Sequence, residues 1–150
     1  MLDSLYMFSD AQSVAAVVDD AWTDATNYAD LTGGTQGKDA FGNAINIDVF
    51  DAKLFLNVRV TTLLAGNALK VALWTDADTT FAGSGTRMAE LLVPDAAAVG
   101  ECYSVGIPSN MTILRYLIVG YETDTSTHMS AGALDCWIGL NPVTPNFIPH

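Results

Sequence analysis

Alternation of apolar and polar residues with a period of two is the feature that most constrains this chain. In "LFLNVRVTT", which begins at residue 54, every second residue from the first is Leu or Val as far as residue 60. "LKVALW", from residue 69, repeats the pattern after the pair Gly66-Asn67. Successive side chains of a β-strand point to opposite faces, so both segments are predicted to be strands with one buried face. We expect a hairpin, because Gly and Asn tolerate the positive φ of a tight turn.

The same alternation recurs along the rest of the chain. Further strands are predicted between segments rich in Gly, Asp, Asn, Thr and Pro, at 45–49, 86–93, 101–105, 113–121 and 131–140. Both faces of 113–121 are apolar except for Arg115, which is typical of a strand covered on both sides. Roughly eight strands with such turns between them predict an all-β fold, a jelly-roll-like antiparallel β-sandwich.

The last ten residues, "NPVTPNFIPH", hold three of the five prolines. Proline lacks an N–H, so this segment can neither join a central strand nor continue a helix. We expect a sandwich domain over 1–140 and an extended C-terminal arm over 141–150. The apolar Val143, Phe147 and Ile148 of the arm are expected to lie on a neighbouring surface rather than in water.

Residues 9–25 carry a conflicting pattern. Val14, Val17 and Trp22 are among apolar residues that follow helical spacing, and Ser9 with Gln12 has the form of a capping box. Taken alone, this pattern favours a helix. Residues 32–43, "TGGTQGKDAFGN", are expected to form a surface loop.

Composition limits the classes of partner. Half of the 150 residues are hydrophobic, which fits one domain with a real core, and the net charge is −11. An acidic chain with scattered cations cannot neutralise a row of phosphates, so no nucleic acid is expected as a partner. No apolar stretch is long enough to span a bilayer, and "MLDSLYMFSD" lacks the features of a secretion signal, so we expect no membrane contact. Cys102 and Cys136 are expected to be buried thiols in a reducing compartment.

Asp76, Asp78 and Thr80 form a DxDxT motif at the end of a predicted strand. Such a motif can carry the nucleophile of an aspartate-based phosphatase, or alternating oxygen ligands for Ca²⁺. The strand before it alternates instead of being continuously hydrophobic, no amphipathic helix follows, and the Gly and distal Glu of a calcium loop are missing. We expect a solvated acidic turn, solvated His128 and His150, no catalysis, no metal and no cofactor.

Trp74 and Trp137 are predicted to lie opposite the aliphatic faces of their strands and therefore to be exposed. Exposed indoles suit either a platform for stacking sugars or packing at a subunit interface, where aromatic residues are enriched. We favour the interface. The alternative is a carbohydrate-binding β-sandwich module.

Several short segments carry a family resemblance. These are "FSDAQSV", "TNYADLTGG", the pair of strands in "LNVRVTTLLAGNALKVALWTDADTTF", and above all 107–140, "IPSNMTILRYLIVGYETDTSTHMSAGALDCWIGL". Together they resemble the capsid cement, or decoration, proteins of tailed bacteriophages, in which a Pro-containing turn leads to an "R-Y-L-x-x-x-Y"-like strand. The segment "DDAWTDA" departs from that family. The resemblance implies a jelly-roll-like fold without catalysis or cofactor, and an extended "DAQSVAAVV", which predicts a strand over about 11–18.

The resemblance also implies a structural virion protein that binds the outside of the capsid and stabilises contacts between major capsid subunits. Such a protein would be assembled in the host bacterial cytoplasm, and we expect a homo-oligomer, dimer or trimer, with the major capsid protein as partner. The residues expected to make partner contacts are Trp74, Arg115, Tyr116, Trp137, Val143, Phe147 and Ile148.

Overall fold

The structure is a computed structural model of the chain. It describes residues 6–18, 21–30, 37–38, 44–45, 54–77, 85–108, 114, 116–139 and 141–143. Every regular element within these ranges is a β-strand. The predicted all-β fold is confirmed, and no helix occurs in the described part of residues 9–25.

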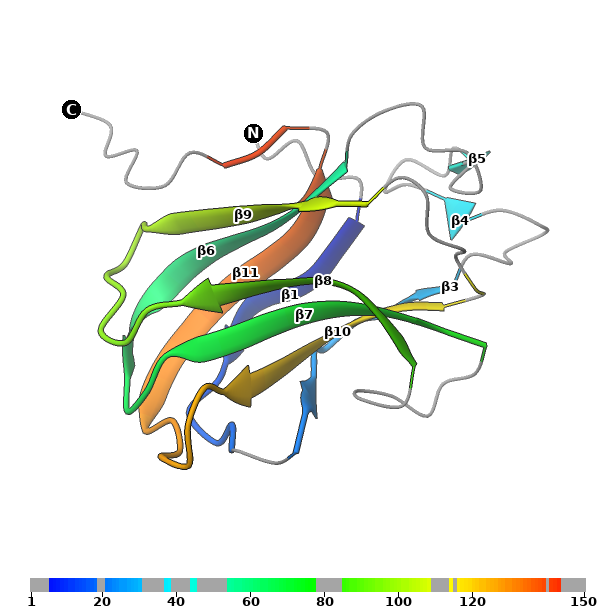
Figure 1. The fold of residues 1–150 in the computed structure, drawn as a ribbon. Coiled ribbons are helices and arrows are strands. Elements are labelled where there is room, and N and C mark those ends of the chain that lie inside the picture. The colour runs from blue at the N-terminus through cyan, green and yellow to red at the C-terminus, as the bar shows by residue number, and fades with distance from the viewer. Residues whose placement is uncertain are drawn as a thin grey trace.

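Two antiparallel sheets pack face to face (Figure 1). Sheet A has four strands, in the order β1 (Tyr6–Ser13), β11 (Ala131–Gly139), β6 (Leu54–Ala65) and β9 (Cys102–Ile107). Sheet B has five strands, β2 (Thr23–Asp24), β10 (Tyr116–Thr123), β7 (Leu69–Asp76) and β8 (Thr86–Val93) in order, with β3 (Ala29–Asp30) also paired to β10. A separate ribbon joins β4 (Gly37–Lys38) to β5 (Ala44–Ile45), so the predicted loop at 32–43 contains a short strand.

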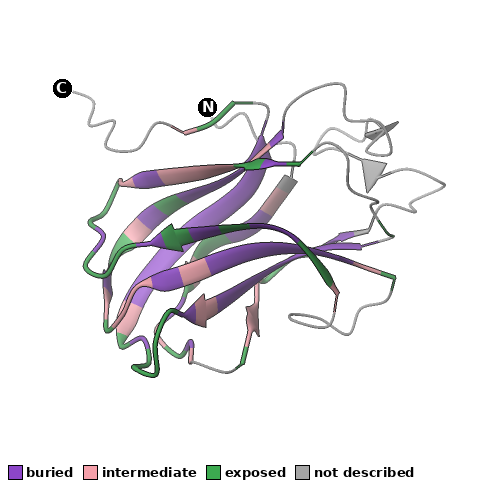
Figure 2. Ribbon diagram, viewed as in Figure 1, coloured by how far each residue is buried: buried purple, intermediate pink, exposed green. Residues whose placement is uncertain are grey.

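The hydrophobic core lies between the two sheets. Alternate residues of β6, among them Leu56 and Val58, point inward and are fully buried, as are Val71 and Leu73 of β7. The period-two pattern therefore identified the core-facing side of both strands correctly. Figure 2 shows buried residues along the length of β7, β10 and β11. All eight residues of β10 except Glu122 are buried, in agreement with a strand covered on both sides.

The predicted hairpin between the segments at 54 and 69 is wrong. β6 pairs with β11 and β9, whereas β7 pairs with β10 and β8, so the chain crosses from one sheet to the other at residues 66–68. The predicted turn chemistry is confirmed only at Gly66, which has a φ of +115°, because Asn67 does not have a positive φ. Asn67 stabilises the crossing, because its amide nitrogen donates to Thr125 Oγ1 at 2.6 Å and to the Thr127 carbonyl at 2.9 Å. Alternation identifies a buried face but cannot identify the neighbouring strand.

The N-terminal strand lies earlier than the predicted 11–18, since β1 ends at Ser13. Ser9 Oγ and Gln12 Oε1 do interact, at 2.6 Å, but across a bulge in which Ala11 has a φ of +47° and not at a helix start. The helical spacing has a simple cause. A single turn, closed by the Val17 N–H and the Val14 carbonyl at 3.1 Å, buries both valines on one side.

Other predicted strands agree with the structure at their centres. The segment 86–93 coincides with β8, 101–105 with most of β9, and 131–140 with β11. For 45–49, only the first residue lies within the described part of the chain, in β5. Cys102 and Cys136 are both buried free thiols, as predicted.

Candidate functional site

The side of sheet B turned away from the core carries a second cluster of hydrophobic side chains. Ala72, Trp74, Tyr116 and Ile118 are its buried members, and Trp22 packs on them from the segment before β2. We call this surface the outer B face and define it by Trp22, Lys70, Ala72, Trp74, Arg87, Glu90, Tyr116, Ile118 and Glu122. Because these residues alternate with core residues along β7 and β10, the face is separate from the interior of the sandwich.

Two cations lie over the indoles of the outer B face. The rings of Trp22 and Trp74 meet edge to face with their centroids 5.3 Å apart. The Arg87 guanidinium lies 5.0 Å from the Trp22 ring and 4.6 Å from the Trp74 ring, and Lys70 Nζ lies 5.7 Å from the Trp22 ring. Such cation–π contacts are each worth about 0.5–1 kcal/mol at exposed sites and more when desolvated.

Trp74 is consequently covered, with only 6% of its surface exposed. The prediction that Trp74 is exposed is wrong, because Trp22 and Arg87 lie over it. No described residue accepts a hydrogen bond from its buried Nε1. On this face Arg87 and Glu90 are exposed to solvent, and Trp22 is half-buried.

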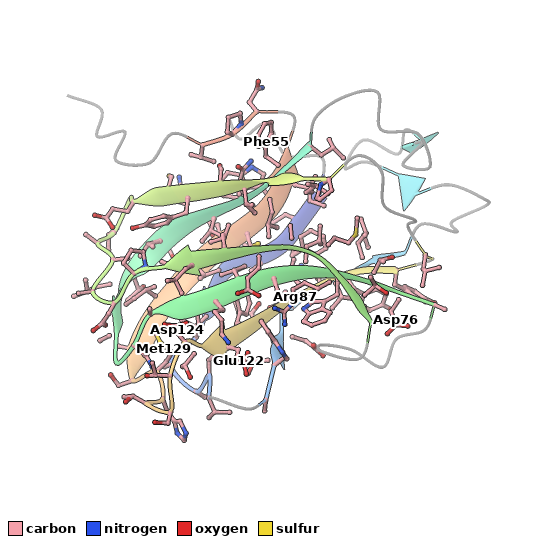
Figure 3. The ribbon with its side chains drawn as sticks, viewed as in Figure 1. Phe55, Asp76, Arg87, Glu122, Asp124 and Met129 are labelled. Atoms are coloured by element: carbon pink, nitrogen blue, oxygen red, sulfur yellow. The ribbon has the colours of Figure 1, made fainter. Side chains whose placement is uncertain are left out.

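Positive and negative side chains are balanced on the outer B face. Lys70 Nζ lies 3.0 Å from Glu122 Oε2, and this hydrogen bond raises the pKa of Lys70. Arg87 pairs with Glu90, three residues further along β8. Figure 3 shows Arg87 and Glu122 together on the side of sheet B that faces away from sheet A. On a chain with a net charge of −11, a locally balanced surface can approach an acidic protein with little repulsion.

The opposite surface of the sandwich, the outer A face, is defined by Phe55, Asn57, Arg59, Ser104, Asp135 and Trp137. Trp137 is 2% exposed, so the prediction that it is exposed is also wrong. Asp135 is buried beside it, where Oδ2 lies 3.1 Å from Arg59 Nη2 and Oδ1 accepts the Ala11 N–H at 2.7 Å. The carboxylate therefore fixes the bulge in β1.

The predicted contact residues are thus divided between two faces. Trp74 and Tyr116 belong to the outer B face and Trp137 to the outer A face, on opposite sides of the molecule. Phe55, on the outer A face, lies far from Arg87 in Figure 3. Arg115, Phe147 and Ile148 lie outside the described residues.

The beginning of the predicted arm lies on its own domain. Asn57 Nδ2 donates to the Asn141 carbonyl at 3.0 Å, and Ser104 Oγ accepts the Val143 N–H at 2.7 Å. The backbone of Val143, a predicted partner contact, is therefore bound to β6 and β9 of the same chain. We call the side chains of Asn57 and Ser104, together with the backbone of 141–143, the C-terminal clasp.

No protein-family model matches this chain, and no curated protein matches it either. Of the DxDxT motif, only Asp76 is described; its Oδ1 accepts the Ala77 N–H at 2.6 Å, as in a turn, and Asp78 and Thr80 lie outside the described residues. His128 is exposed, and His150 is not among the described residues.

Within the described residues, no three His, Cys, Asp or Glu side chains gather closely enough to hold a metal ion, and no helix could cross a membrane.

Sequence reasoning missed Trp22 and Arg87 as parts of one surface. The available signal was Ala72, Trp74 and Ile118, apolar residues at the outward positions of β7 and β10. It also missed four exposed aliphatic side chains, Leu63, Leu92, Val99 and Leu114. Two of these stand in the adjacent pairs Leu63-Leu64 and Leu91-Leu92, where alternation is broken.

Proposed function

We propose that this protein is a structural virion component, without catalysis or cofactor, that binds the outside of a bacteriophage capsid as a dimer or trimer. It would stabilise contacts between subunits of the major capsid protein. The resemblance of 107–140 to capsid cement proteins supports this proposal, and the two-sheet fold is compatible with it. A shell needs clamps across its subunit junctions, and many small interfaces acting together supply strength by multivalency.

The strand order supports the jelly-roll-like form of the sandwich. The first strand, β1, pairs with the last, β11. The chain crosses between the sheets at the β6–β7, β8–β9, β9–β10 and β10–β11 connections. Jelly rolls are double-sheet folds of this kind, made from two Greek keys.

The observation that carries the proposal is the outer B face. Trp, Tyr and Arg are the residues most enriched in the energetic centres of protein interfaces, and this face places Trp22, Tyr116 and Arg87 outside the core. Its charges are balanced within the chain, so docking does not require an uncompensated charge to be buried. We propose that the outer B face docks on the capsid shell.

Two exposed arginines provide a matched test. The side chain of Arg87 on the outer B face is 43% exposed and that of Arg59 on the outer A face is 44% exposed. Arg87→Gln should weaken binding to purified capsids by about tenfold, since interface arginines cost about 1 kcal/mol or more when truncated. Arg59→Gln should leave binding nearly unchanged, and circular dichroism should show both variants folded.

The measurement is the amount of each variant bound per purified particle, obtained by quantitative gel analysis and by imaging. Equal binding by both arginine variants would exclude the outer B face as the docking surface. Absence of the wild-type protein from particles, together with no binding to capsids, would exclude the proposed function.

The carbohydrate-binding alternative depends on Trp74 or Trp137 as the platform on which a sugar would stack. Stacking against a sugar requires an open indole face, whereas Trp74 is 6% exposed and Trp137 is 2% exposed. We therefore do not propose it.

A further inference from the structure

Most edge strands of the sandwich carry a feature that prevents pairing with another chain. Strand β1, at one edge of sheet A, has two register shifts and a residue with positive φ, Ala11. Strand β8, at one edge of sheet B, has a register shift and is followed by Pro94. At the other edge of sheet B, β2 and β3 are two residues long each. Bulges, prolines and very short strands are the usual protection of a sheet edge.

Strand β9 differs from these edges. It borders sheet A, and it pairs with β6 in unbroken register from Cys102 to Ile107 (Figure 1). Its sequence, "CYSVGI", contains no charged residue and no proline, and Tyr, Val and Ile favour strands. Among the described strands, β9 is therefore the one sheet edge that is long, regular and uncharged.

The ladder between β6 and β9 determines which backbone groups face the open edge. The Val60 N–H donates to the Glu101 carbonyl at 2.9 Å, just before β9 begins. Hydrogen-bonded pairs alternate along an antiparallel ladder, so every second residue of β9 turns its N–H and C=O toward β6. The residues whose N–H and C=O point away from β6 are Cys102, Ser104 and Gly106. The C-terminal clasp leaves these groups free, because it binds Ser104 through the side chain.

We propose that β9 pairs with β9 of a second copy of this chain, antiparallel and about a two-fold axis at Ser104. The pairing joins two four-stranded sheets A into one continuous sheet. The inference rests on the proposed function, because it names the contact between the copies that bind the shell.

The two-fold axis at Ser104 uses every open group of the edge. It places Ser104 opposite its own copy and Cys102 opposite Gly106 of the second copy, so each N–H meets a C=O. On the inner side of the sheet, Tyr103 then lies beside Val105 of the second copy. Both side chains already pack against the core, and an aromatic residue beside a β-branched one is a favourable cross-strand pair.

Neighbouring registers leave open groups without partners. An axis at Val105 would place Cys102 opposite Pro108, which has no N–H. An axis at Tyr103 would place Gly106 opposite Gly100, whose N–H already donates to the Val60 carbonyl at 2.8 Å. The backbone of β9 therefore favours one register of self-pairing.

A second copy fits this edge for reasons of charge and symmetry. The chain has a net charge of −11, and an uncharged strand allows two copies to meet without placing like charges opposite each other. The contact uses the same strand from both copies, so the assembly closes as a dimer. A two-fold axis perpendicular to the sheet turns both outer B faces to the same side, where both can dock on the shell and reinforce each other.

The first test measures oligomeric state by analytical ultracentrifugation. The wild type should sediment with twice the 15.9 kDa mass of one chain. Gly106→Pro removes an N–H that faces the open edge and none that faces β6, so it should raise the dimer dissociation constant at least about thirtyfold. Gly106→Ala keeps the N–H and should dimerise like the wild type, because the added Cβ would lie an ordinary 3.9 Å from Phe55 Cε1.

Circular dichroism should show that both Gly106 variants are folded. A wild type that is monomeric or trimeric would overturn the inference. Equal dimerisation by Gly106→Pro and Gly106→Ala would overturn it as well, because the two variants differ at the edge N–H.

The second test examines the register by disulfide cross-linking. Opposite residues of a hydrogen-bonded pair have Cα atoms about 5.5 Å apart, within the range that a disulfide spans. Under a mild oxidant, Gly106→Cys should therefore form covalent dimers through Cys102 of the second copy. The amount of covalent dimer should fall at least about tenfold in Gly106→Cys/Cys102→Ala. Equal cross-linking in both variants, or none in either, would exclude this register.

Capsid binding separates the inference from the proposed function. A dimeric wild type that does not bind purified capsids would overturn the proposed function and leave the β9 pairing intact. A monomeric wild type that binds capsids would overturn the pairing and leave the capsid role intact. If that monomer lost capsid binding in Gly106→Pro but not in Gly106→Ala, the occupant of the edge would be an extended segment of a shell protein and not a second copy.

Discussion

Tyr121 and Cys136 bring two ionisable side chains into the core from opposite sheets. Both are fully buried, and the Tyr121 hydroxyl lies 2.6 Å from Ser9 Oγ. Burial raises the pKa of Tyr121 well above its ordinary value and raises that of the Cys136 thiol as well. The hydroxyl and the thiol are therefore neutral in the folded protein, as expected of polar groups removed from water.

These pKa shifts predict a loss of stability at alkaline pH. A cysteine in the unfolded chain ionises near pH 8.5, whereas folded Cys136 stays protonated. A pKa raised by folding gives stability that is fully present below the unfolded pKa and is lost as the pH rises above it. The free energy of unfolding should fall above about pH 9, with Cys136 contributing up to about 1.4 kcal/mol per pH unit.

Urea titrations of the wild type and Cys136→Ala at several alkaline pH values measure this contribution. The variant should be less stable at neutral pH but should lose stability less steeply with rising pH. Parallel pH profiles for the two proteins would show that the buried thiol does not drive the loss.

At the scale of elements, the short connections decide which strands become neighbours. The crossing at residues 66–68 leaves no room beside its glycine: a Cβ on Gly66 would lie 2.6 Å from the His128 carbonyl oxygen and 2.8 Å from the Ser130 nitrogen. The Ser130 N–H also donates to the Ala65 carbonyl at 2.9 Å. Close backbone approach therefore ties the β6–β7 crossing to the segment that leads into β11.

A comparison of two glycines with positive φ distinguishes the energetic cost of backbone strain from the cost of crowding. Gly66 has a φ of +115° and Gly100 a φ of +90°, but no described atom lies within 4 Å of a Cβ built on Gly100. Gly100→Ala should cost about 1 kcal/mol, and Gly66→Ala about 3 kcal/mol or more because the backbone must also shift. Urea unfolding measures both, and equal costs would show that the close approach at Gly66 has no energetic weight.

At the scale of the whole molecule, one hydrophobic core joins both sheets. Its members include Leu56 and Val58 from sheet A and Val71 and Leu73 from sheet B. If the two sheets separate, the inner face of each becomes exposed to water. The outer B face adds a smaller packed cluster around Trp22 and Trp74, and Trp137 is buried on the outer A face.

A shared core predicts a single cooperative unfolding transition. Tryptophan fluorescence reports on the two outer faces, and far-ultraviolet circular dichroism reports on the sheets. The two signals should change at the same urea concentration, as they do for most single domains of about this size. An earlier fluorescence transition that disappears in Trp22→Phe would instead show that the outer B face opens before the core.

Sequence patterns were sufficient to predict the all-β fold, the inward sides of β6 and β7, and β10 as a strand buried on both faces. Each of these depends on local backbone geometry, because consecutive side chains of a strand point to opposite faces whatever the strand pairs with. The helical pattern before β2 was misleading for a related reason. One turn that buries Val14 and Val17 produces the same spacing as a helix.

Tertiary structure alone decided the neighbours of each strand and the covering of each outer face. Trp74 lies at an outward position, as predicted, yet Trp22 and Arg87 cover it from segments distant in sequence. Asn57 and Ser104 likewise meet Val143 only because β6 and β9 pair and the chain end returns across them. The period of the sequence pattern predicts the face of the strand to which a side chain points. Whether that side chain is buried depends on which other segment packs over it in the folded chain.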